Sequence, residues 1–173
     1  MQLILADDLA VIREKYIEVI EHTKDMDVHA RWIYGQHPTD AMIQSYIDGQ
    51  EMYLFMDGQN IAGMTAITMY QGEEYHEVIW SQDLKDDEVA SLHIFTVTPE
   101  YQRKGVSKRM MAEIISLAMK KRKKSIRLDT LASNIPAQHM YEKLGFEYRG
   151  KQNLYAENTG WTDFLYYELS LQT

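Results

Sequence analysis

The segment Val97–Ser107 constrains this chain most, because it joins a predicted strand to a predicted helix through a basic loop that contains glycine. Val89–Val97 is rich in apolar and β-branched residues, which is typical of a buried strand. After the loop, Val106, Met110 and Ile114 recur at the spacing of one helix face. The first turn of such a helix presents backbone N–H groups without intrahelical partners, and such groups bind phosphate. The sequence therefore predicts an anion site at this helix start.

The loop residues themselves support a negatively charged ligand. Gly105 allows the backbone to approach a ligand closely. Arg103, Lys104 and Lys108 surround the helix start with positive charge, which opposes the helix dipole unless an anion is bound. An ordinary strand-to-helix turn with solvated basic side chains explains the same residues. The loop has neither the second glycine of a Walker A motif nor the three glycines of a dinucleotide fingerprint.

A second pattern runs from Asn134 to Phe146, one predicted helix and one predicted strand further along. Asn134 can cap a helix, and Ala137 and Tyr141 then follow on the same helix face. The small residue leaves room for a ligand, and the tyrosine hydroxyl can donate a proton to a leaving group. A plain helix cap and a packed tyrosine account for these residues without any ligand.

Together, the two patterns resemble the GCN5-related N-acetyltransferase (GNAT) family. The run from Gln102 to Ser107 matches the family's loop pattern Arg/Gln-x-x-Gly-x-Gly/Ala, except that Ser107 stands where the family prefers glycine or alanine. The run from Asn134 to Phe146 matches Asn-x-x-Ala-x-x-x-Tyr-x-x-x-Gly-Phe at every fixed position. The resemblance is specific over residues 89–148 and looser before them.

The resemblance implies that acetyl-coenzyme A is the cosubstrate and that no metal is needed. Its pyrophosphate would lie on the loop amides, and its pantetheine arm would lie where the strand ending at Val97 splays from Ser125–Leu131. An amide near Phe95 would polarise the acetyl carbonyl, and Tyr141 would protonate the leaving thiolate. The implied cosubstrate-binding residues are Phe95, Thr96, Val97, Gln102, Arg103, Lys104, Gly105, Val106, Ser107, Lys108, Asn134 and Tyr141.

The group that deprotonates the acceptor amine is less well defined by the sequence. Asp129 matches a position that some relatives use as an acid, and His93 alternates onto the strand face shared by Ser91 and Phe95. Glu88 is a further option. A structural carboxylate and a satisfied core histidine explain Asp129 and His93 equally simply. The candidate catalytic residues are therefore Tyr141, Asp129 and His93.

The order of predicted elements mixes strands with helices, so the fold class is α/β (α+β). Hairpins in the first half predict antiparallel pairing, and the β-α-β unit in the second half predicts a parallel or splayed neighbour. Strands are expected at 1–6, 52–56, 61–70, 89–97, 125–131, 146–149 and 164–171, with 75–80 as a further candidate. With the resemblance, this predicts one domain over 1–173, in which four or so helices flank a centrally splayed, mostly antiparallel mixed sheet of six to seven strands.

Composition narrows the function further. The absence of cysteine excludes disulfides, thiolate metal sites and a cysteine nucleophile. The sequence lacks an apolar run long enough for a membrane span, which predicts a cytoplasmic protein without a membrane partner. The net charge of −8 argues against a nucleic-acid partner and suits a cationic acceptor. Trp32, Tyr34 and Trp80 are expected either to line the acceptor side or simply to pack.

We therefore expect acetyl transfer from acetyl-coenzyme A to a primary amine of a small molecule, by direct attack on the thioester. One alternative is a protein acetyltransferase that acts on an N-terminal amine or a lysine, and another is a non-catalytic acyl-coenzyme A sensor. The aromatic segment Trp161–Tyr167 is compatible with an edge-to-edge homodimer, although a buried last strand has the same pattern. The sequence does not identify the acceptor.

Overall fold

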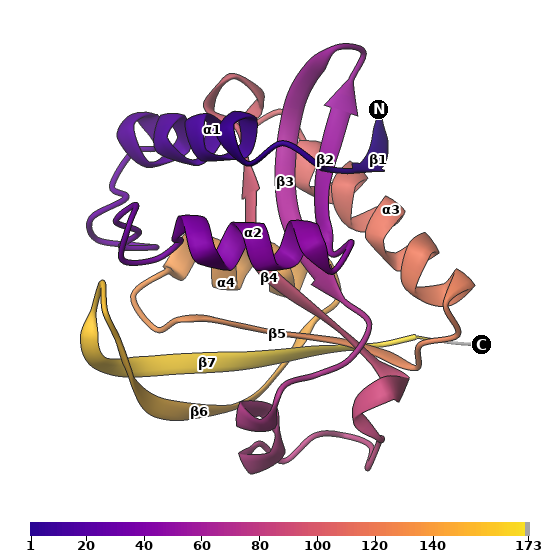
Figure 1. Ribbon diagram of the computed structural model, residues 1–173. Helices are drawn as coiled ribbons and strands as arrows, with labels where there is room; N and C mark the ends of the chain where they lie inside the picture. Colours follow the sequence, from indigo (N-terminus) through magenta and orange to yellow (C-terminus); the bar gives the residue numbers. More distant parts are fainter. Residues whose placement is uncertain (172–173) are drawn as a thin grey trace.

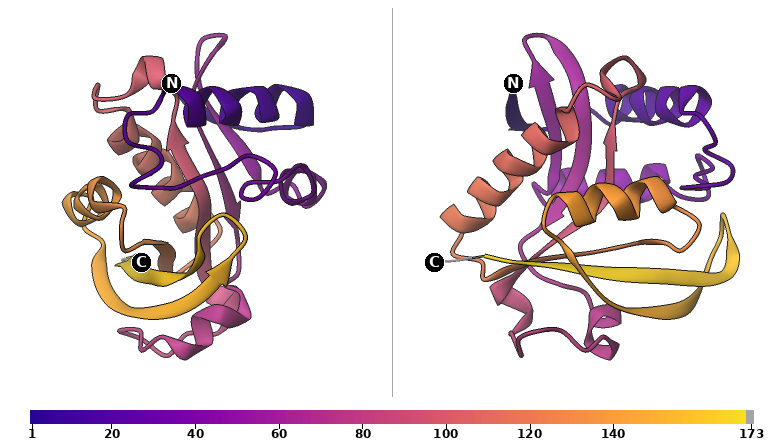
Figure 2. Two further views of the ribbon diagram at one scale, coloured as in Figure 1. Left: turned by 90° about the vertical axis from the view of Figure 1, so that its left-hand side faces the viewer. Right: turned by 180° about the vertical axis from the view of Figure 1, so that it is seen from behind.

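The computed structural model describes residues 1–171 as a seven-stranded sheet with two α-helices on each face (Figures 1 and 2). The strand order is β1-β2-β3-β4-β5-β7-β6, and every neighbouring pair is antiparallel except β4 and β5. The elements are β1 (Gln2–Leu5), α1 (Leu9–His22), α2 (Asp40–Asp48), β2 (Met52–Asp57), β3 (Asn60–Thr68), η1 (Glu73–Glu77), η2 (Asp86–Glu88), β4 (Val89–Val97), η3 (Pro99–Tyr101), α3 (Val106–Lys120), β5 (Ser125–Leu131), α4 (Ile135–Lys143), β6 (Glu147–Ala156) and β7 (Gly160–Ser170). The predicted mixed, mostly antiparallel sheet with four helices is confirmed.

The helix starts follow the capping residues in the sequence. Asp8 accepts hydrogen bonds from the first-turn amides of α1, and Thr39 accepts one from the amide of Met42 in α2. Asn134 does the same for Ala137 in α4. Each bond satisfies an N–H group that the helix itself leaves free. Among residues 1–171, none of the helices combines the length and apolar character that a membrane span requires.

Residues 75–80 do not form the further strand that the sequence suggested. Tyr75 and Val78 are the buried positions, so the apolar spacing is three rather than the two of a strand. This segment instead covers a buried cation, because the Arg127 guanidinium lies 4.3 Å from the centroid of the Trp80 ring. Arg127 also pairs with a buried glutamate of β7, Glu168, at 3.0 Å. The contact with the Arg127 guanidinium therefore stabilises this loop, and local sequence patterns do not reveal such a distant partner.

The aromatic segment Trp161–Tyr167 lies in β7, which pairs with β5 on one side and β6 on the other. Its backbone groups are therefore already used within the sheet. An edge-to-edge contact through this strand is excluded, and the interpretation as an interior strand is the correct one. The strand at this end of the sheet is β6.

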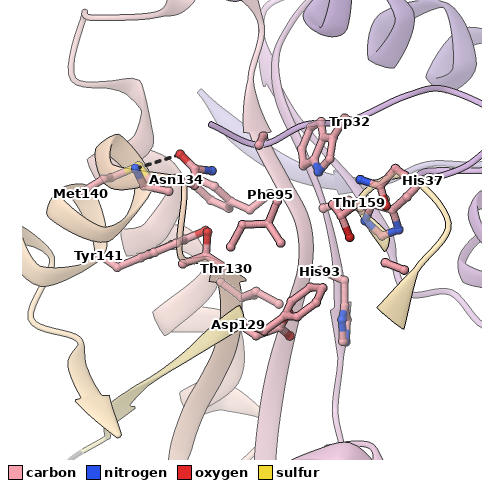
Figure 3. Close-up of a pocket in the computed structure, with 18 of the residues that line it drawn as sticks. Trp32, His37, His93, Phe95, Asp129, Thr130, Asn134, Met140, Tyr141 and Thr159 are labelled. Atoms are coloured by element: carbon pink, nitrogen blue, oxygen red, sulfur yellow. Dashed lines mark hydrogen bonds between the residues drawn. The ribbon is translucent and has the colours of Figure 1, made fainter. Parts of the chain in front are cut away.

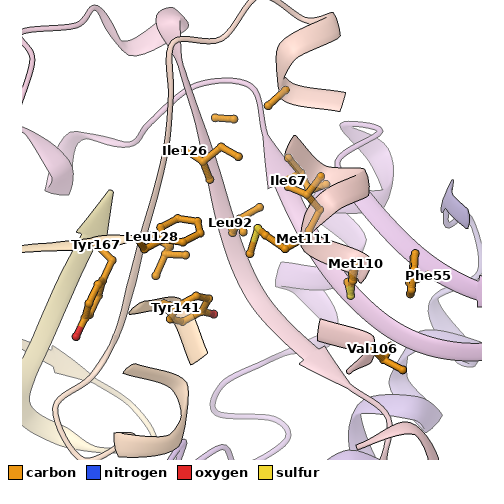
Figure 4. Packing of buried hydrophobic residues seen from close by; sticks show 14 of the residues in the cluster. Phe55, Ile67, Leu92, Val106, Met110, Met111, Ile126, Leu128, Tyr141 and Tyr167 are labelled. Carbon is orange, nitrogen blue, oxygen red and sulfur yellow. The ribbon is translucent and has the colours of Figure 1, made fainter. Parts of the chain in front are cut away.

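The core consists of two apolar layers, one on each face of the sheet. One layer packs α3 and α4 against the sheet, with Met110, Ile114 and Tyr141 among its buried members (Figure 4). The other packs α1 and α2 against the opposite face and includes Ile12 and Ile43. The left view of Figure 2 shows the helices on both sides of the strands. Burial on both faces makes the central strands rigid supports for whatever lies between them.

The sheet splits between β4 and β5. The two strands pair only at their beginnings, from Val89 opposite Ser125 to Ser91 opposite Arg127. Beyond Ser91 the strands diverge, and the edge of β4 that faces β5 has no strand partner. This is the central splay that the sequence predicted, and it leaves backbone N–H and C=O groups open to a ligand.

A β-bulge lies in β4 where the split opens. In the register with β3, Ala66 is opposite His93 and Met64 is opposite Thr96, so β4 has one extra residue. Ile94 takes a φ of 47°, which is strained for a β-branched side chain. The Tyr16 hydroxyl of α1 donates to the Ile94 carbonyl oxygen at 2.8 Å. Helix α1 thus fixes the shape of the strand that lines the split.

We expect Tyr16→Phe to destabilise the fold by about 1–3 kcal/mol, because it leaves the buried Ile94 carbonyl without this donor. Urea unfolding at neutral pH would measure the change. Tyr155→Phe is the matched control, since Tyr155 is 58% exposed. Equal stability of the two variants would show that the bond does not support the bulge.

Candidate active site

A cavity of about 190 Å³ occupies the split between β4 and β5 (Figure 3). The residues that line it come from both halves of the chain and include all three candidate catalytic residues. No lysine or arginine is among these lining residues, and Asp129 is their one carboxylate. They are Ala30, Trp32, His37, Tyr46, Leu92, His93, Ile94, Phe95, Asp129, Thr130, Leu131, Asn134, Ala137, Met140, Tyr141, Ala156, Asn158, Thr159 and Phe164.

The cavity has two walls of different origin. Figure 3 shows Asn134 and Tyr141 of α4 on one side and Trp32 and His37 on the other. Trp32 and His37 belong to residues 23–38, which we call the strap. The strap connects α1 to α2 and is hydrogen-bonded to the β6–β7 turn, because the Asn158 side chain donates to the Arg31 carbonyl oxygen.

Tyr141 lies on the inner face of α4, and only 6% of its surface is exposed. Its ring contacts Phe95 of β4 and Phe146, with centroid distances of 6.2 and 5.6 Å. Burial raises the pKa of the Tyr141 hydroxyl, so the group keeps its proton at neutral pH. A protonated hydroxyl at the cavity wall is suited to donate a proton or a hydrogen bond.

Asp129 lies on β5 and receives a hydrogen bond from the Tyr75 hydroxyl at 2.7 Å. Burial raises the pKa of its carboxyl group, while the Tyr75 hydrogen bond acts in the opposite direction. The tyrosine therefore stabilises the charged form of a carboxylate that would otherwise be costly to bury. Sequence analysis could not assign this partner, because Tyr75 comes from the segment predicted as a strand.

His93 lies on β4 with its ring stacked on Tyr46 of α2, at a centroid distance of 5.7 Å and an interplanar angle of 18°. Its Nε2 atom lies 3.3 Å from the Thr68 hydroxyl. Burial lowers the pKa of His93 to about 4, so its ring is neutral at physiological pH. His93 lines the cavity, but its ring is also packed against Tyr46 and Thr68.

The basic loop begins where β4 ends and carries Gly105 at the N-cap of α3 with a φ of 74°. No side chain among residues 1–171 caps this helix, so its first-turn amides have no such partner. Arg103, Lys104 and Lys108 are exposed around it. This 15-residue helix thus starts with free donors and positive charge, as an anion site requires.

Two of the predicted cosubstrate-binding residues, Gln102 and Asn134, also form hydrogen bonds within the protein. The Gln102 side chain donates to the Val97 carbonyl oxygen at 3.1 Å and to the Thr23 hydroxyl at 2.9 Å. The Asn134 carbonyl oxygen caps α4, while in Figure 3 its amide nitrogen points toward the cavity. Gln102 therefore shapes the loop, and the Val97 carbonyl oxygen already has a donor.

Other residues singled out from the sequence lie away from the cavity. Glu88 pairs with Lys124 at the opposite end of β4 from the split. Trp80 covers Arg127, and the Tyr34 hydroxyl donates to Asp40 at 2.6 Å. Of the three aromatic residues proposed for the acceptor side, Trp32 is among the cavity-lining residues.

Sequence reasoning missed four polar or aromatic side chains that line the acceptor wall: His37, Tyr46, Asn158 and Thr159. They belong to the strap, to α2 and to the β6–β7 turn, which no single motif connects. Tertiary packing alone brings these residues to Asp129.

The model of the GNAT acetyltransferase family matches residues 16–146. The chain belongs to the GNAT acetyltransferase family. A curated relative, N-acetylaspartate synthetase of Xenopus tropicalis, is 32% identical over 73 residues, or 42% of this chain. The chain spans 27% of the length of that relative.

Solved structures of GNAT proteins share the fold along almost the whole chain. An acetyltransferase of this family from Streptococcus agalactiae has a TM-score of 0.75 at 19% identity, over 99% of this chain and 96% of its own. The protein yncA of Salmonella typhimurium, solved with its cofactor acetyl-CoA, has a TM-score of 0.68 at 16% identity, over 100% and 95%. The ribosomal-protein-S18-alanine N-acetyltransferase of Escherichia coli has a TM-score of 0.66 at 18% identity, over 99% and 94%.

The burial of Asp129 has a consequence for stability that Asp129→Asn tests. Because burial raises its folded pKa, the stability tied to the protonated carboxyl is complete below the ordinary aspartate pKa and is lost as pH rises through the raised value. The asparagine variant keeps an oxygen that accepts from Tyr75. We expect it to unfold at higher urea concentration than the unmodified protein at about pH 8, with little difference at about pH 3.

Asp7→Asn is the control for this comparison, since Asp7 is exposed. A variant at Asp129 that is less stable than the unmodified protein at high pH would contradict the prediction. That result would mean that favourable contacts of the carboxylate outweigh its desolvation.

Proposed function

We propose that this protein transfers the acetyl group of acetyl-coenzyme A to a primary amine of a small molecule. The observation that carries the proposal is the cavity in the split sheet, which is lined by the titratable side chains His37, His93 and Asp129. The strand β4 that lines it leads on to the start of α3, which has no side-chain cap. Family membership supports the reaction class.

The basic loop suits the pyrophosphate of the donor. In the proposal, the backbone amides from Arg103 to Lys108 bind the phosphate oxygens, and Gly105 keeps the loop open because it lacks a Cβ. Positive charge at a helix start is unfavourable without a ligand, and the two phosphates remove this conflict. Ser107 is half-buried beside these amides, and its hydroxyl adds a potential donor.

The split suits the extended arm of the donor. After Ser91, the open edge of β4 offers backbone groups to the amides of the pantetheine arm, in the manner of an added strand. In the proposal, Phe95 and Thr96 line this path next to the bulge, and the Phe95 amide polarises the acetyl carbonyl. The free amide nitrogen of Asn134 contacts the arm from the opposite wall.

The chemistry then needs one proton donor and one proton acceptor. The coenzyme supplies an activated thioester, and the protein positions the amine for direct attack on it. In the proposal, Tyr141 protonates the departing thiolate, because its hydroxyl keeps its proton and faces the cavity. In the proposal, the proton acceptor is one of the titratable side chains on the side where the amine enters, which include Asp129 and His93.

The acceptor side favours a small cation over a peptide. The strap and the β6–β7 turn are tied together, because the Asn158 side chain donates to the Arg31 carbonyl oxygen at 2.8 Å and Arg31 donates to the Thr159 carbonyl oxygen at 3.3 Å. These contacts narrow the entrance that a peptide would need. Asp129 supplies negative charge, and the cavity lining has no lysine or arginine to bind an acidic acceptor.

Calorimetric titration with acetyl-coenzyme A, followed by a thiol-release assay against a panel of polyamines, aryl amines, amino acids and short peptides, tests the proposal. We expect saturable donor binding and thiol release with one class of small amine. Donor binding without release on any amine would favour an acyl-coenzyme A sensor. Absence of donor binding would overturn the proposal.

We expect Tyr141→Phe to lower kcat by about 100-fold or more, within the range of general acid catalysis, with little change in donor affinity. The phenylalanine keeps the ring contacts with Phe95 and Phe146, so the core should stay packed. Steady-state kinetics and calorimetry together measure the two quantities. Unchanged kcat would remove Tyr141 from the acid role.

We expect Gly105→Ala to weaken donor binding, because a Cβ at a φ of 74° strains the loop by about 1–2 kcal/mol and shifts its amides. Gly160→Ala is the matched control. Gly160 has a similar φ of 70° and equally open surroundings, but it is the first residue of β7, far along the chain from the loop. Equal donor affinity in both variants would argue against the loop as the phosphate site.

A further inference from the structure

We propose that His37 is the catalytic base that removes the proton from the acceptor ammonium, with Asp129 stabilising the imidazolium that forms. The inference rests on the proposed function and adds a residue that no motif of the sequence marks. It follows from the position of His37 in the cavity, from its fixed backbone and from the groups that face it.

The backbone at His37 is held in a tight turn. The His37 amide donates to the Ile33 carbonyl oxygen at 2.9 Å, and the Gly35 amide donates to the Pro38 carbonyl oxygen at 2.9 Å. Further back, the strap is fixed to the β5–α4 connection, because the Ser133 hydroxyl donates to the His29 carbonyl oxygen at 2.9 Å. These hydrogen bonds fix the backbone from which the His37 imidazole extends into the cavity.

His37 faces the cavity from the wall opposite Tyr141 (Figure 3). Direct transfer needs a base where the amine enters and an acid where the thiolate leaves. The two residues lie on the two sides of β4, whose bulge is the proposed position of the acetyl carbonyl. Their placement matches the two proton transfers of the reaction.

The other candidate bases are already engaged by the protein. His93 is stacked on Tyr46 and lies beside the Thr68 hydroxyl. Asp129 accepts the hydrogen bond of Tyr75. Among residues 1–171 the side chain of His37 has no such partner, so both ring nitrogens remain for a ligand or water.

Asp129 of β5 and His93 of β4 line the same cavity as His37, and their charges act on its ring. Burial lowers the pKa of His37, which leaves the imidazole neutral and able to accept a proton at neutral pH. The Asp129 carboxylate acts in the opposite direction and favours the protonated ring. A neutral base that shares a cavity with a buried carboxylate is the arrangement that a transient imidazolium needs.

The proton balance of the proposed step is complete. One proton passes from the acceptor ammonium to His37 and then to solvent, and the amine lone pair forms the bond to the acetyl carbon. The carbon–sulfur bond breaks, Tyr141 gives its proton to the thiolate, and the second proton of the attacking nitrogen restores Tyr141. The products are the acetamide, the free thiol and one proton.

Turnover of two probe amines by His37→Gln, with acetyl-coenzyme A as donor, tests the role. Ethylamine is protonated at neutral pH, so a base must deprotonate it before attack. Methoxyamine is already neutral at this pH and needs no such step. We expect kcat/KM to fall by about 100-fold or more for ethylamine, with partial rescue by added imidazole, and to change little for methoxyamine. His22→Gln, at the exposed end of α1, is the control. Equal losses for both probes would overturn the base role.

Nuclear magnetic resonance titration of the histidine rings gives a readout that does not depend on turnover. The signal lost in His37→Gln identifies His37, and we expect Asp129→Asn to lower its pKa because the facing carboxylate is gone. An unchanged His37 pKa in Asp129→Asn would overturn the proposed pair. Failure of every acetyl-coenzyme A assay with an intact pair would instead count against the proposed function.

Discussion

The parting of β4 from β5 after Ser91 is the constraint on which the rest of this structure depends. The buried Arg127–Glu168 pair fixes the closed end of the split, and the bulge at Ile94 sets the open end. A buried ion pair of this kind is costly unless both partners are well satisfied, and Trp80 covers it on one face. Here both partners are satisfied, since Arg127 also donates to Gln71 and to the Gln82 carbonyl oxygen and Glu168 also accepts from Ser81 and Arg149.

The two apolar layers explain why the split does not collapse. Helices α3 and α4 bury one face of the sheet, and α1 and α2 bury the other, so each diverging strand is supported independently. The wall near α4 and the wall formed by the strap then differ in chemistry. One presents a hydroxyl and a helix start, and the other presents imidazole and indole rings beside a carboxylate. In the proposed function, this asymmetry separates the side of the donor from the side of the acceptor.

The proposed donor half of the site has recognisable sequence patterns and the proposed acceptor half does not, for a physical reason. Phosphate binding and helix capping depend on residues close together in the chain, so Gln102–Ser107 and Asn134–Phe146 carry recognisable patterns. The acceptor wall is assembled from segments that meet only in three dimensions, which is why His37 had no signal. The false strand at 75–80 has a similar origin, because a distant cation, Arg127, decides its conformation.

In the proposed function, a donor bound at the open edge of β4 also stabilises the fold. A ligand bound there would form hydrogen bonds with the part of the β4 backbone that β5 does not pair with. It would then act as a non-covalent eighth strand of the seven-stranded sheet. Donor binding is then coupled to folding. Each tenfold rise in donor concentration above the dissociation constant adds about 1.4 kcal/mol to the free energy of unfolding. The resistance of this protein to unfolding inside a cell would thereby follow the supply of acyl donor.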